Sequence, residues 1–425
     1  MESEERSAAG PFRRRGGSRN LPAHVLPLGR RLPYRRSAGE GPAGPTALLE
    51  RVLTEGWTVE FLSRIRQPSF HPEERVLLGD FLLSMTVVRA LLEACESGGA
   101  APGPVRYRGP YGRLMERSEM EFEIVPGDHT GTGVSTAGAH PVPLEARPVV
   151  PPRWRDVAER PDRRMVTLPA WLDQTEEGVR VHADVPMRHY LQLEQDLGVR
   201  LPRDGDVAPR YRSRSRYGDD RHVVLVATSS KPDIKDYGVG NFFRVARELR
   251  ERTGTDLRLT LLTNDRRAAA DLPAALPVEV ALGVDAADCV DLFGGAGLVI
   301  GNDTGLTHLA ALTVRADGSG PQVIGLHNVF SPLKWVTGSP RHHTISTAFA
   351  QQVALADVDV CATSFAAEID PTLWGARADL ASLSPKDVAG FAAEVMDRKD
   401  GEQRQRPPTR GGTHGDGQAR RRSRQ

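Results

Sequence analysis

Cysteine and lysine are both scarce in this chain of 425 residues. The three cysteines, Cys95, Cys289 and Cys361, are far apart and show no C-x-x-C spacing. This pattern argues against a disulfide framework and against a cysteine-based structural zinc site, and it favours a reducing, cytoplasmic location. Five lysines stand against 51 arginines. Richness in Arg, Ala, Gly and Pro indicates a compositional bias and carries no function by itself.

Long apolar runs are also missing. No stretch approaches the roughly 18 apolar residues that a membrane-spanning helix needs. The first residues, MESEERS, are acidic and polar, unlike a secretory signal. We therefore expect no integral membrane segment, although the sequence is compatible with peripheral contact with a membrane. Hydrophobic content of 39% and charged content of 26% are typical of globular proteins, and the length suits two domains.

A net charge of +1 hides basic ends around an acidic centre. Residues 1–45 hold nine Arg and four Glu, and residues 401–425 hold seven Arg, one Glu and one Asp, so each end carries +5. The remainder, residues 46–400, therefore carries −9. We predict disordered basic tails at both ends. The centre lacks the basic footprint of a nucleic-acid-binding protein, so we expect no nucleic-acid partner.

Strands and helices alternate in the second half of the chain. Apolar runs predict strands at 222–228, 257–263, 278–282, 297–300 and 322–327, and helices at 241–254, 286–296 and 304–312. This alternation predicts a doubly wound α/β fold with a parallel sheet, which binds ligands at the carboxyl ends of its strands. The loops that follow strands should therefore share one edge. They are residues 228–240, 263–265, 301–305 and 327–335.

The first half is less regular. Apolar spacing predicts one or two helices within residues 46–66 and an amphipathic helix over 80–96, followed by a strand–helix–strand rhythm over 105–125. Residues 126–162 form a stretch that is longer than an ordinary loop. We expect five segments in total: a tail at 1–45, an N-terminal domain at 46–210, a linker at 211–221, a C-terminal domain at 222–400 and a tail at 401–425.

The segment GNDTGLTHLAAL, residues 301–312, is the most informative stretch. It predicts a turn between a buried strand and a helix, where Asp303 or Thr304 can cap the helix and Gly305 lets the backbone approach a ligand closely. Such a helix start suits an anion. An ordinary capped turn is the alternative. His308, one turn into the helix, is either a ligand-binding residue or a packed core histidine.

Two of the five lysines, Lys231 and Lys235, lie four residues apart in one loop after a predicted strand. A compact ammonium group on a flexible stem suits a phosphate. Two solvent-facing lysines are the alternative interpretation.

Three segments together resemble glycosyltransferase family 9, the ADP-heptose-dependent heptosyltransferases of bacterial surface-glycan assembly. They are DTGLTHLAAL at 303–312, ATSSKPDIKDYGVGNFF at 227–243 and LGDFLLSMTVVRALLEA at 78–94. The similarity spans about residues 70 to 398. It implies a GT-B architecture, in which two Rossmann-like domains face a cleft. The donor nucleotide would bind the C-terminal domain, and the acceptor would bind the N-terminal one.

The resemblance also implies roles for individual residues. Asp80 would be the general base that takes the proton from an acceptor hydroxyl, with a helix cap as the alternative. Asp303 would shape the turn, and His308 would be a further donor-site residue. The remaining donor-binding candidates are Lys235, Ser229, Ser230, Thr304 and Gly305 for the diphosphate, Asp265 for the ribose and Val284 for the base.

The sequence departs from the family pattern near the expected sugar. The family's Gly-Pro-Thr after the strand at 322–327 is replaced by His327, Asn328 and Val329. Trp335 still resembles the family's aromatic residue. No metal site is predicted, because Asp357 and Asp359 have the D-x-D form but a divalent cation needs oxygens from more than two residues. No cofactor is expected; the ADP-sugar would be the donor substrate.

The sequence thus predicts an inverting, metal-independent glycosyltransferase that moves a heptose or a related sugar from an ADP-sugar. The acceptor would be a hydroxyl of a glycan or of a small molecule. Two alternatives stay open: another GT-B nucleotide-sugar enzyme, such as an epimerase, and a non-catalytic nucleotide-binding protein.

Overall fold

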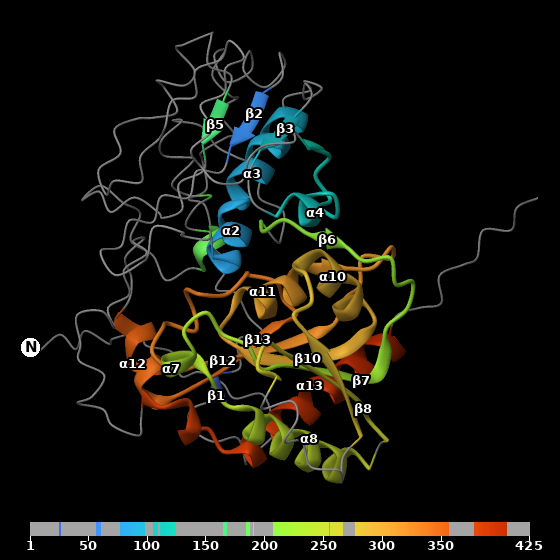
Figure 1. The fold of residues 1–425 in the computed structure, drawn as a ribbon, viewed down its shortest axis with the longest axis vertical. Coiled ribbons are helices and arrows are strands. Elements are labelled where there is room, and N and C mark those ends of the chain that lie inside the picture. Colours follow the sequence, from blue (N-terminus) through green and yellow to red (C-terminus); the bar gives the residue numbers. More distant parts are fainter. Residues whose placement is uncertain are drawn as a thin grey trace, which may run out of the picture.

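Two sheets with helices packed on them make up the described part of the chain (Figure 1). The computed structural model describes residues 25–26, 57–60, 77–97, 105–108, 111–124, 165–167, 184–187, 190, 207–254, 256–266, 277–356 and 378–405. Residues 126–162, the D-x-D segment at 357–359 and most of the two predicted tails lie outside these residues.

The larger sheet has seven strands in the order β1-β13-β12-β10-β7-β8-β9. They are β7 (Asp219–Val226), β8 (Arg258–Thr263), β9 (Val278–Leu282), β10 (Ala296–Asn302), β12 (Gln322–His327), β13 (His342–Ser346) and β1 (Val25–Leu26). All neighbours pair in parallel except β1, which joins β13 antiparallel. The strand order reverses between β7 and β10, so these neighbours flank the point where doubly wound sheets bind ligands.

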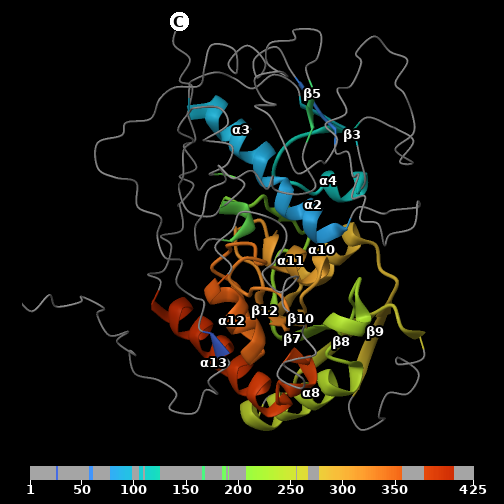
Figure 2. The same ribbon diagram turned by 90° about the vertical axis from the view of Figure 1, so that its left-hand side faces the viewer.

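The central position of β10 in the sheet explains why this strand is buried. Every residue of β10 is buried, as expected of a central parallel strand covered on both faces. One face is covered by α8 (Val239–Thr253) and α13 (Pro385–Gln405), whose apolar residues share a core cluster with the sheet. The other face is covered by α10 (Ala286–Gly294) and α11 (Gly305–Leu312), as Figures 1 and 2 show.

Smaller elements complete this part. They are β6 (Tyr211–Arg212), paired with β11 (Thr313–Val314), and the helical segments α7 (Pro232–Lys235), α12 (Ala348–Ala356) and η3 (Leu380–Ser382). The predicted glycine stop of α8 is confirmed, since Gly254 adopts a left-handed conformation at φ 60° and its amide bonds the carbonyl of Arg250.

A second, four-stranded sheet lies in the N-terminal half. Its strands are β2 (Trp57–Glu60), β3 (Val105–Arg108), β4 (Glu123–Ile124) and β5 (Met165–Thr167), all parallel, in the order β4-β3-β2-β5. The first of them, β2, lies between β3 and β5, just as β7 lies between β8 and β10. The helices of this half are α2 (Leu78–Ser84), α3 (Thr86–Ser97) and α4 (Gly112–Met115). The predicted class, α/β with parallel sheets, is confirmed.

Several local predictions were wrong. The predicted helix in 46–66 contains the strand β2, because pairing with β3 and β5 overrides a helical apolar spacing in a segment that includes Trp57 and two β-branched residues. The predicted helix 80–96 starts earlier and is divided at Met85 into α2 and α3. The predicted linker 211–221 contains β6 and the start of β7, and α13 continues to Gln405, inside the predicted tail.

One hydrophobic core joins the two sheets. Phe81 of α2 and Leu114 of α4 belong to the same buried cluster as Phe293 of α10 and Leu309 of α11. In both views α2 points down onto α11 (Figures 1 and 2). Gly305, the first residue of α11, lies so close to α2 that a Cβ there would be 2.6 Å from the Gly79 amide nitrogen and 2.7 Å from the Leu78 Cβ.

None of the helices in the described ranges combines the length and the apolar character that crossing a bilayer requires.

The contact between α2 and α11 predicts the effect of adding one methyl group. Gly305→Ala should lower the free energy of unfolding by about 1–3 kcal/mol, because the new Cβ meets backbone that cannot move away without separating the helices. The measurement is the urea-unfolding midpoint and Tm. Gly240→Ala is the matched control, since open space surrounds this glycine of α8. It should be neutral or stabilising by up to about 1 kcal/mol. Equal effects of the two substitutions would contradict the close approach.

Candidate functional site

The turn between β10 and α11 is tied to the loop after β7 by one amide side chain. Asn302 is fully buried, and its Oδ1 accepts a hydrogen bond from the Tyr237 amide at 3.0 Å. Its Nδ2 donates to the Thr228 carbonyl at 3.3 Å and to Asp236 Oδ1 at 3.1 Å. All three partners lie in the segment that carries the two lysines. The two loops at the strand-order reversal are therefore held together by hydrogen bonds, as the shared-edge prediction requires.

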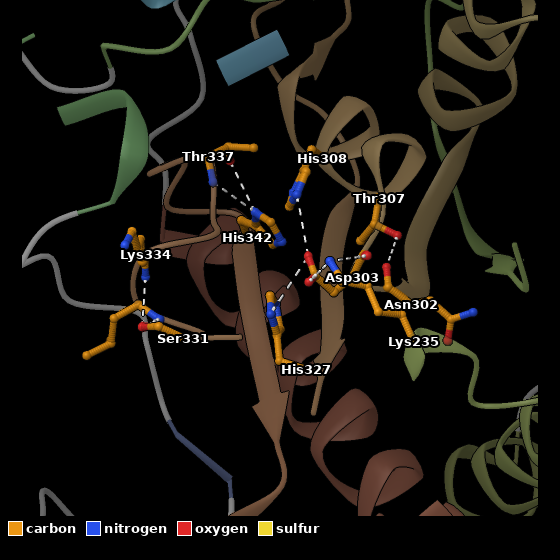
Figure 3. Close-up of polar contacts among 11 residues, drawn as sticks. Lys235, Asn302, Asp303, Thr307, His308, His327, Ser331, Lys334, Thr337 and His342 are labelled. Carbon is orange, nitrogen blue, oxygen red and sulfur yellow. Dashed lines mark hydrogen bonds and ion pairs between the residues drawn. The ribbon is translucent and has the colours of Figure 1, made fainter. Parts of the chain in front are cut away.

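A buried ion pair stands at the centre of this edge (Figure 3). Lys235 Nζ lies 2.6 Å from Asp303 Oδ2, and the Asp303 side chain is only 4% exposed. Burial alone would raise the pKa of Asp303, but Lys235, His327 and His308 together outweigh burial and hold that pKa well below its usual range. Asp303 is thus an ionised anchor for Lys235.

The capped-turn alternative is wrong in its details. Thr304 is the N-cap residue of α11, yet its side chain makes no capping hydrogen bond, and the Asp303 carboxylate faces Lys235. The first amides of any helix lack intrahelical partners, and they carry the positive end of the helix dipole. The start of α11 therefore keeps its capacity for an anion.

Three buried histidines surround Asp303 (Figure 3). His308 Nε2 lies 3.6 Å and His327 Nδ1 3.9 Å from Asp303 Oδ1, and the rings of His308 and His342 are 5.6 Å apart. Burial lowers the pKa of all three, to about 4 for His308, so they are neutral at pH 7. His308 is therefore a core residue that also touches the site.

Two of these histidines were missed by the sequence analysis. Among the described residues, both ring nitrogens of His327 and Nε2 of His342 are buried without a hydrogen-bond partner. The replacement of the family's Gly-Pro-Thr pointed to His327, because it placed a polar ring at the end of a buried strand. His342 gave no such signal, since it lies within a strand that we did not predict.

Asp80 reaches the site from α2, in the N-terminal half of the chain. The N-cap of α2 is Leu77, so Asp80 lies within the first turn and the helix-cap alternative is wrong. The side chain is half-buried, and its pKa is raised to about 6 by burial, against the opposing influence of Lys235 and Lys231. Asp80 directly follows Gly79, which lies against Gly305 at the start of α11, so the first turn of α2 lies beside the turn that carries Asp303. The structure thus brings together residues that lie far apart in the sequence.

The second lysine completes the group. Lys231 is half-buried, and its pKa is lowered by burial and by the like charge of Lys235, while Asp80 and Asp303 act in the opposite direction. Both ammonium groups lie over the ring of Phe330, with Nζ-to-centroid distances of 4.2 Å for Lys235 and 5.8 Å for Lys231. The sequence analysis did not single out Phe330.

The remaining candidates lie on loops at the same edge of the sheet. Ser229 accepts a hydrogen bond from the Lys231 amide at 3.0 Å, and Ser230 is exposed. Asp265 follows β8 and is exposed, with its amide bonded to Thr263 Oγ1. Val284 is half-buried between β9 and α10 and packs against the core. The site proper therefore consists of Asp80, Lys231, Lys235, Asp303, Thr304, Gly305 and His308.

Within the described ranges, no group of three or more His, Cys, Asp or Glu residues is arranged to hold a metal ion. Positive charge at this edge comes from the two lysines and from the start of α11. This donor set suits a phosphate or diphosphate, because it offers ammonium groups and backbone amides around one point.

Parallel α/β sheets bind ligands at the point where their strand order reverses, and this chain places a cationic turn there. Residues 170–357 match the model of glycosyltransferase family 9 (heptosyltransferase). This match agrees with the predicted family and with the predicted enzyme class, glycosyltransferase. No curated protein matches the sequence.

Solved structures of glycosyltransferases also match most of the chain, at low identity. The E. coli heptosyltransferase WaaC with ADP is 13% identical, covering 80% of this chain and 99% of WaaC, at a TM-score of 0.47. E. coli ADP-heptose LPS heptosyltransferase II is 12% identical, covering 81% and 99%, at a TM-score of 0.46. The iron-containing dodecameric glycosyltransferase TibC from enterotoxigenic E. coli is 13% identical, covering 81% and 79%, at a TM-score of 0.42.

The raised pKa of Asp80 predicts a pH-dependent effect on stability. A carboxyl group whose pKa rises on folding stabilises the folded state below its unfolded pKa, and this stability is lost as the pH rises through the folded value. Asp80→Asn should therefore raise the free energy of unfolding by about 1–3 kcal/mol at pH 8 relative to pH 4. Tm measured across this range tests it. Asp397→Asn, exposed on α13, is the control and should change Tm equally at both pH values.

Proposed function

We propose that this chain is an inverting, metal-independent glycosyltransferase that transfers a heptose or a related sugar from an ADP-sugar to a hydroxyl group. The acceptor is a glycan or a small molecule. The observation that carries the proposal is the glycine contact between α2 and α11, which brings the first turn of α2, with Asp80, beside the turn where Asp303 pairs with Lys235. The family match of residues 170–357 supports the reaction class.

The architecture that fits this reaction is GT-B. Residues 46–210 would form a Rossmann-like domain on the acceptor side, and residues 222–400 a Rossmann-like donor domain. Support comes from the repeated strand order of the two parallel sheets, in which the first strand lies between the second and the fourth.

The donor diphosphate binds at the start of α11 in this proposal. Lys235 supplies charge, and the backbone amides after Thr304, that of Gly305 included, supply hydrogen-bond donors. Ser229 and Ser230 border the phosphates, while Asp265 is assigned to the ribose and Val284 to the adenine. An ADP donor fits the family, whose description names heptosyltransferases, and the WaaC structure contains ADP.

Asp80 is the general base of the proposed reaction. Its pKa of about 6 leaves it mostly ionised at pH 7, yet makes it a stronger base than an ordinary aspartate. The acceptor hydroxyl gives its proton to Asp80 as the acceptor oxygen bonds to the anomeric carbon. The bond between that carbon and the phosphate oxygen breaks, and ADP leaves with the electron pair. Lys235 and the α11 amides stabilise the charge that develops on the leaving phosphate.

Replacing the base should separate transfer from binding. Asp80→Asn is expected to lower kcat by at least about 100-fold, because general base catalysis contributes about that much or more, while ADP affinity stays within about threefold. For the wild type, kcat should rise with pH through about 6, the pKa of Asp80. ADP release from an ADP-sugar and calorimetry with ADP are the two measurements. Unchanged turnover in Asp80→Asn would remove the assigned base.

Replacing Lys235, the residue proposed to bind the phosphates, should weaken ADP binding. Lys235→Met is expected to weaken ADP binding by about 10- to 100-fold, the loss expected for a charge-assisted hydrogen bond. Lys386→Met is the control, since Lys386 is exposed at the start of α13 and should leave ADP affinity unchanged. Equal ADP affinity in the two variants would overturn the phosphate role of Lys235.

The same experiments separate the alternatives. A non-catalytic nucleotide-binding protein would bind ADP but release none from any ADP-sugar. An epimerase would change the donor sugar without releasing ADP.

A further inference from the structure

The loop after β12 runs between the two sheets and carries two aromatic rings. We refer to residues 328–337 as the aromatic loop. Phe330 and Trp335 pack edge to face, with ring centroids 6.4 Å apart and an interplanar angle of 75°. Trp335 packs against Leu83 of α2 and against Val185, whose amide donates to the Lys334 carbonyl at 2.9 Å. One end of the aromatic loop is thus fixed to the N-terminal half.

The other end of the aromatic loop is fixed to the lysine segment. Asn328 Nδ2 donates to the Ile234 carbonyl, directly before Lys235. Phe330 also packs against a small buried cluster formed by Val329, Phe349 and Val353. The ring of Phe330 is therefore anchored by packing, and the Lys235 and Lys231 ammonium groups lie over it at 4.2 and 5.8 Å from its centroid.

Two ammonium groups this close to one aromatic ring present an electrostatic problem. Like charges repel each other, and burial together with this repulsion lowers the pKa of Lys231, while the direct ion pair of Asp303 is with Lys235. An aromatic face carries the negative part of a quadrupole and attracts cations within about 6 Å of its centroid. Phe330 offers that face to both lysines at once.

We propose that Phe330 is a positioning residue that holds Lys235 and Lys231 together at the cationic site between Asp80 and Asp303. Its ring attracts both ammonium groups and limits their movement, so that both are preorganised to bind an anionic ligand. The identity of that ligand as the diphosphate of an ADP-sugar rests on the proposed function. The positioning of the lysines does not.

The positioning role can be tested without any ligand, because the chain contains only five lysines. Selective ¹³C labelling of lysine in the full chain gives few ε-methylene signals. The Lys235 signal, identified by its loss in Lys235→Met, should be displaced upfield by the ring current of Phe330. Phe330→Leu should abolish the displacement and Phe330→Tyr should keep it. Phe122→Leu, which removes a half-buried ring packed on Tyr107 in the other half, is the matched control and should keep it. An unchanged Lys235 signal in Phe330→Leu would overturn the proposal.

Binding of ADP gives the second test. Phe330→Leu should weaken ADP binding by about twofold to thirtyfold, the range that a cation–π contact supports. Phe330→Tyr should rescue it to within about twofold. In the Lys231→Met, Lys235→Met background, Phe330→Leu should have no further effect. An effect that is equally large in that background would show that Phe330 acts only through packing, and it would overturn the proposal.

The two tests also distinguish the two hypotheses. If the wild type shows the displaced Lys235 signal but does not bind ADP, the proposed donor is wrong and the positioning role of Phe330 stands. If ADP binds and Phe330→Leu alters neither the signal nor the affinity, the donor stands and the positioning role is wrong.

Discussion

The contact between Gly79 and Gly305 is the constraint on which the rest of the site depends. Any side chain on Gly305 would meet the backbone of α2 within 3 Å, so the two helices can approach this closely only where they lack one. The approach brings the first turn of α2 to the first turn of α11. Asp80 therefore faces residues that follow strands of the other sheet. The same contact makes the two halves share one core, because Phe81 of α2 and Leu309 of α11 belong to one buried cluster.

The two carboxylates of the site have opposite protonation behaviour for a physical reason. Both are removed from bulk water, which by itself favours the neutral acid. Asp303 has a lysine at 2.6 Å and stays ionised even at low pH. Asp80 is influenced by the same lysine without such a direct ion pair, so burial prevails and the pKa rises to about 6. A pair of acids whose environments separate their pKa values is a pattern typical of a catalytic pair with divided roles. Here one acid is suited to holding a cation and the other to accepting a proton.

The fold of the second half was predictable from the sequence because its central strands are buried on both faces and its turns carry glycine. The strands β8, β9, β10 and β12 lie within one or two residues of their expected positions. Asp303 and Lys235 each lie in a loop that follows a predicted strand, so the sequence also predicted that both would lie at the same edge of the sheet. Their direct ion pair was not predictable, because Asp303 before a helix equally suits a cap. The strand β2 and the antiparallel β1 depend on partners distant in the sequence, so local spacing could not indicate them. Phe330 carried no signal either, since its role arises only when the aromatic loop meets the lysines in space.

The scarcity of lysine gains meaning from the structure, because arginine and lysine are used for different tasks. Arg315 and Arg341 spread their planar groups over backbone carbonyls: Arg315 bonds those of Gly294 and Ala296, and Arg341 those of Ala311 and Thr313. The planar guanidinium group of arginine carries five N–H donors and can therefore bind several fixed acceptors at once. At the site, one compact charge must reach Asp303, lie over an aromatic face and remain able to meet an anionic ligand. A flexible ammonium group meets these demands, which accounts for lysine at two positions of a chain that otherwise prefers arginine.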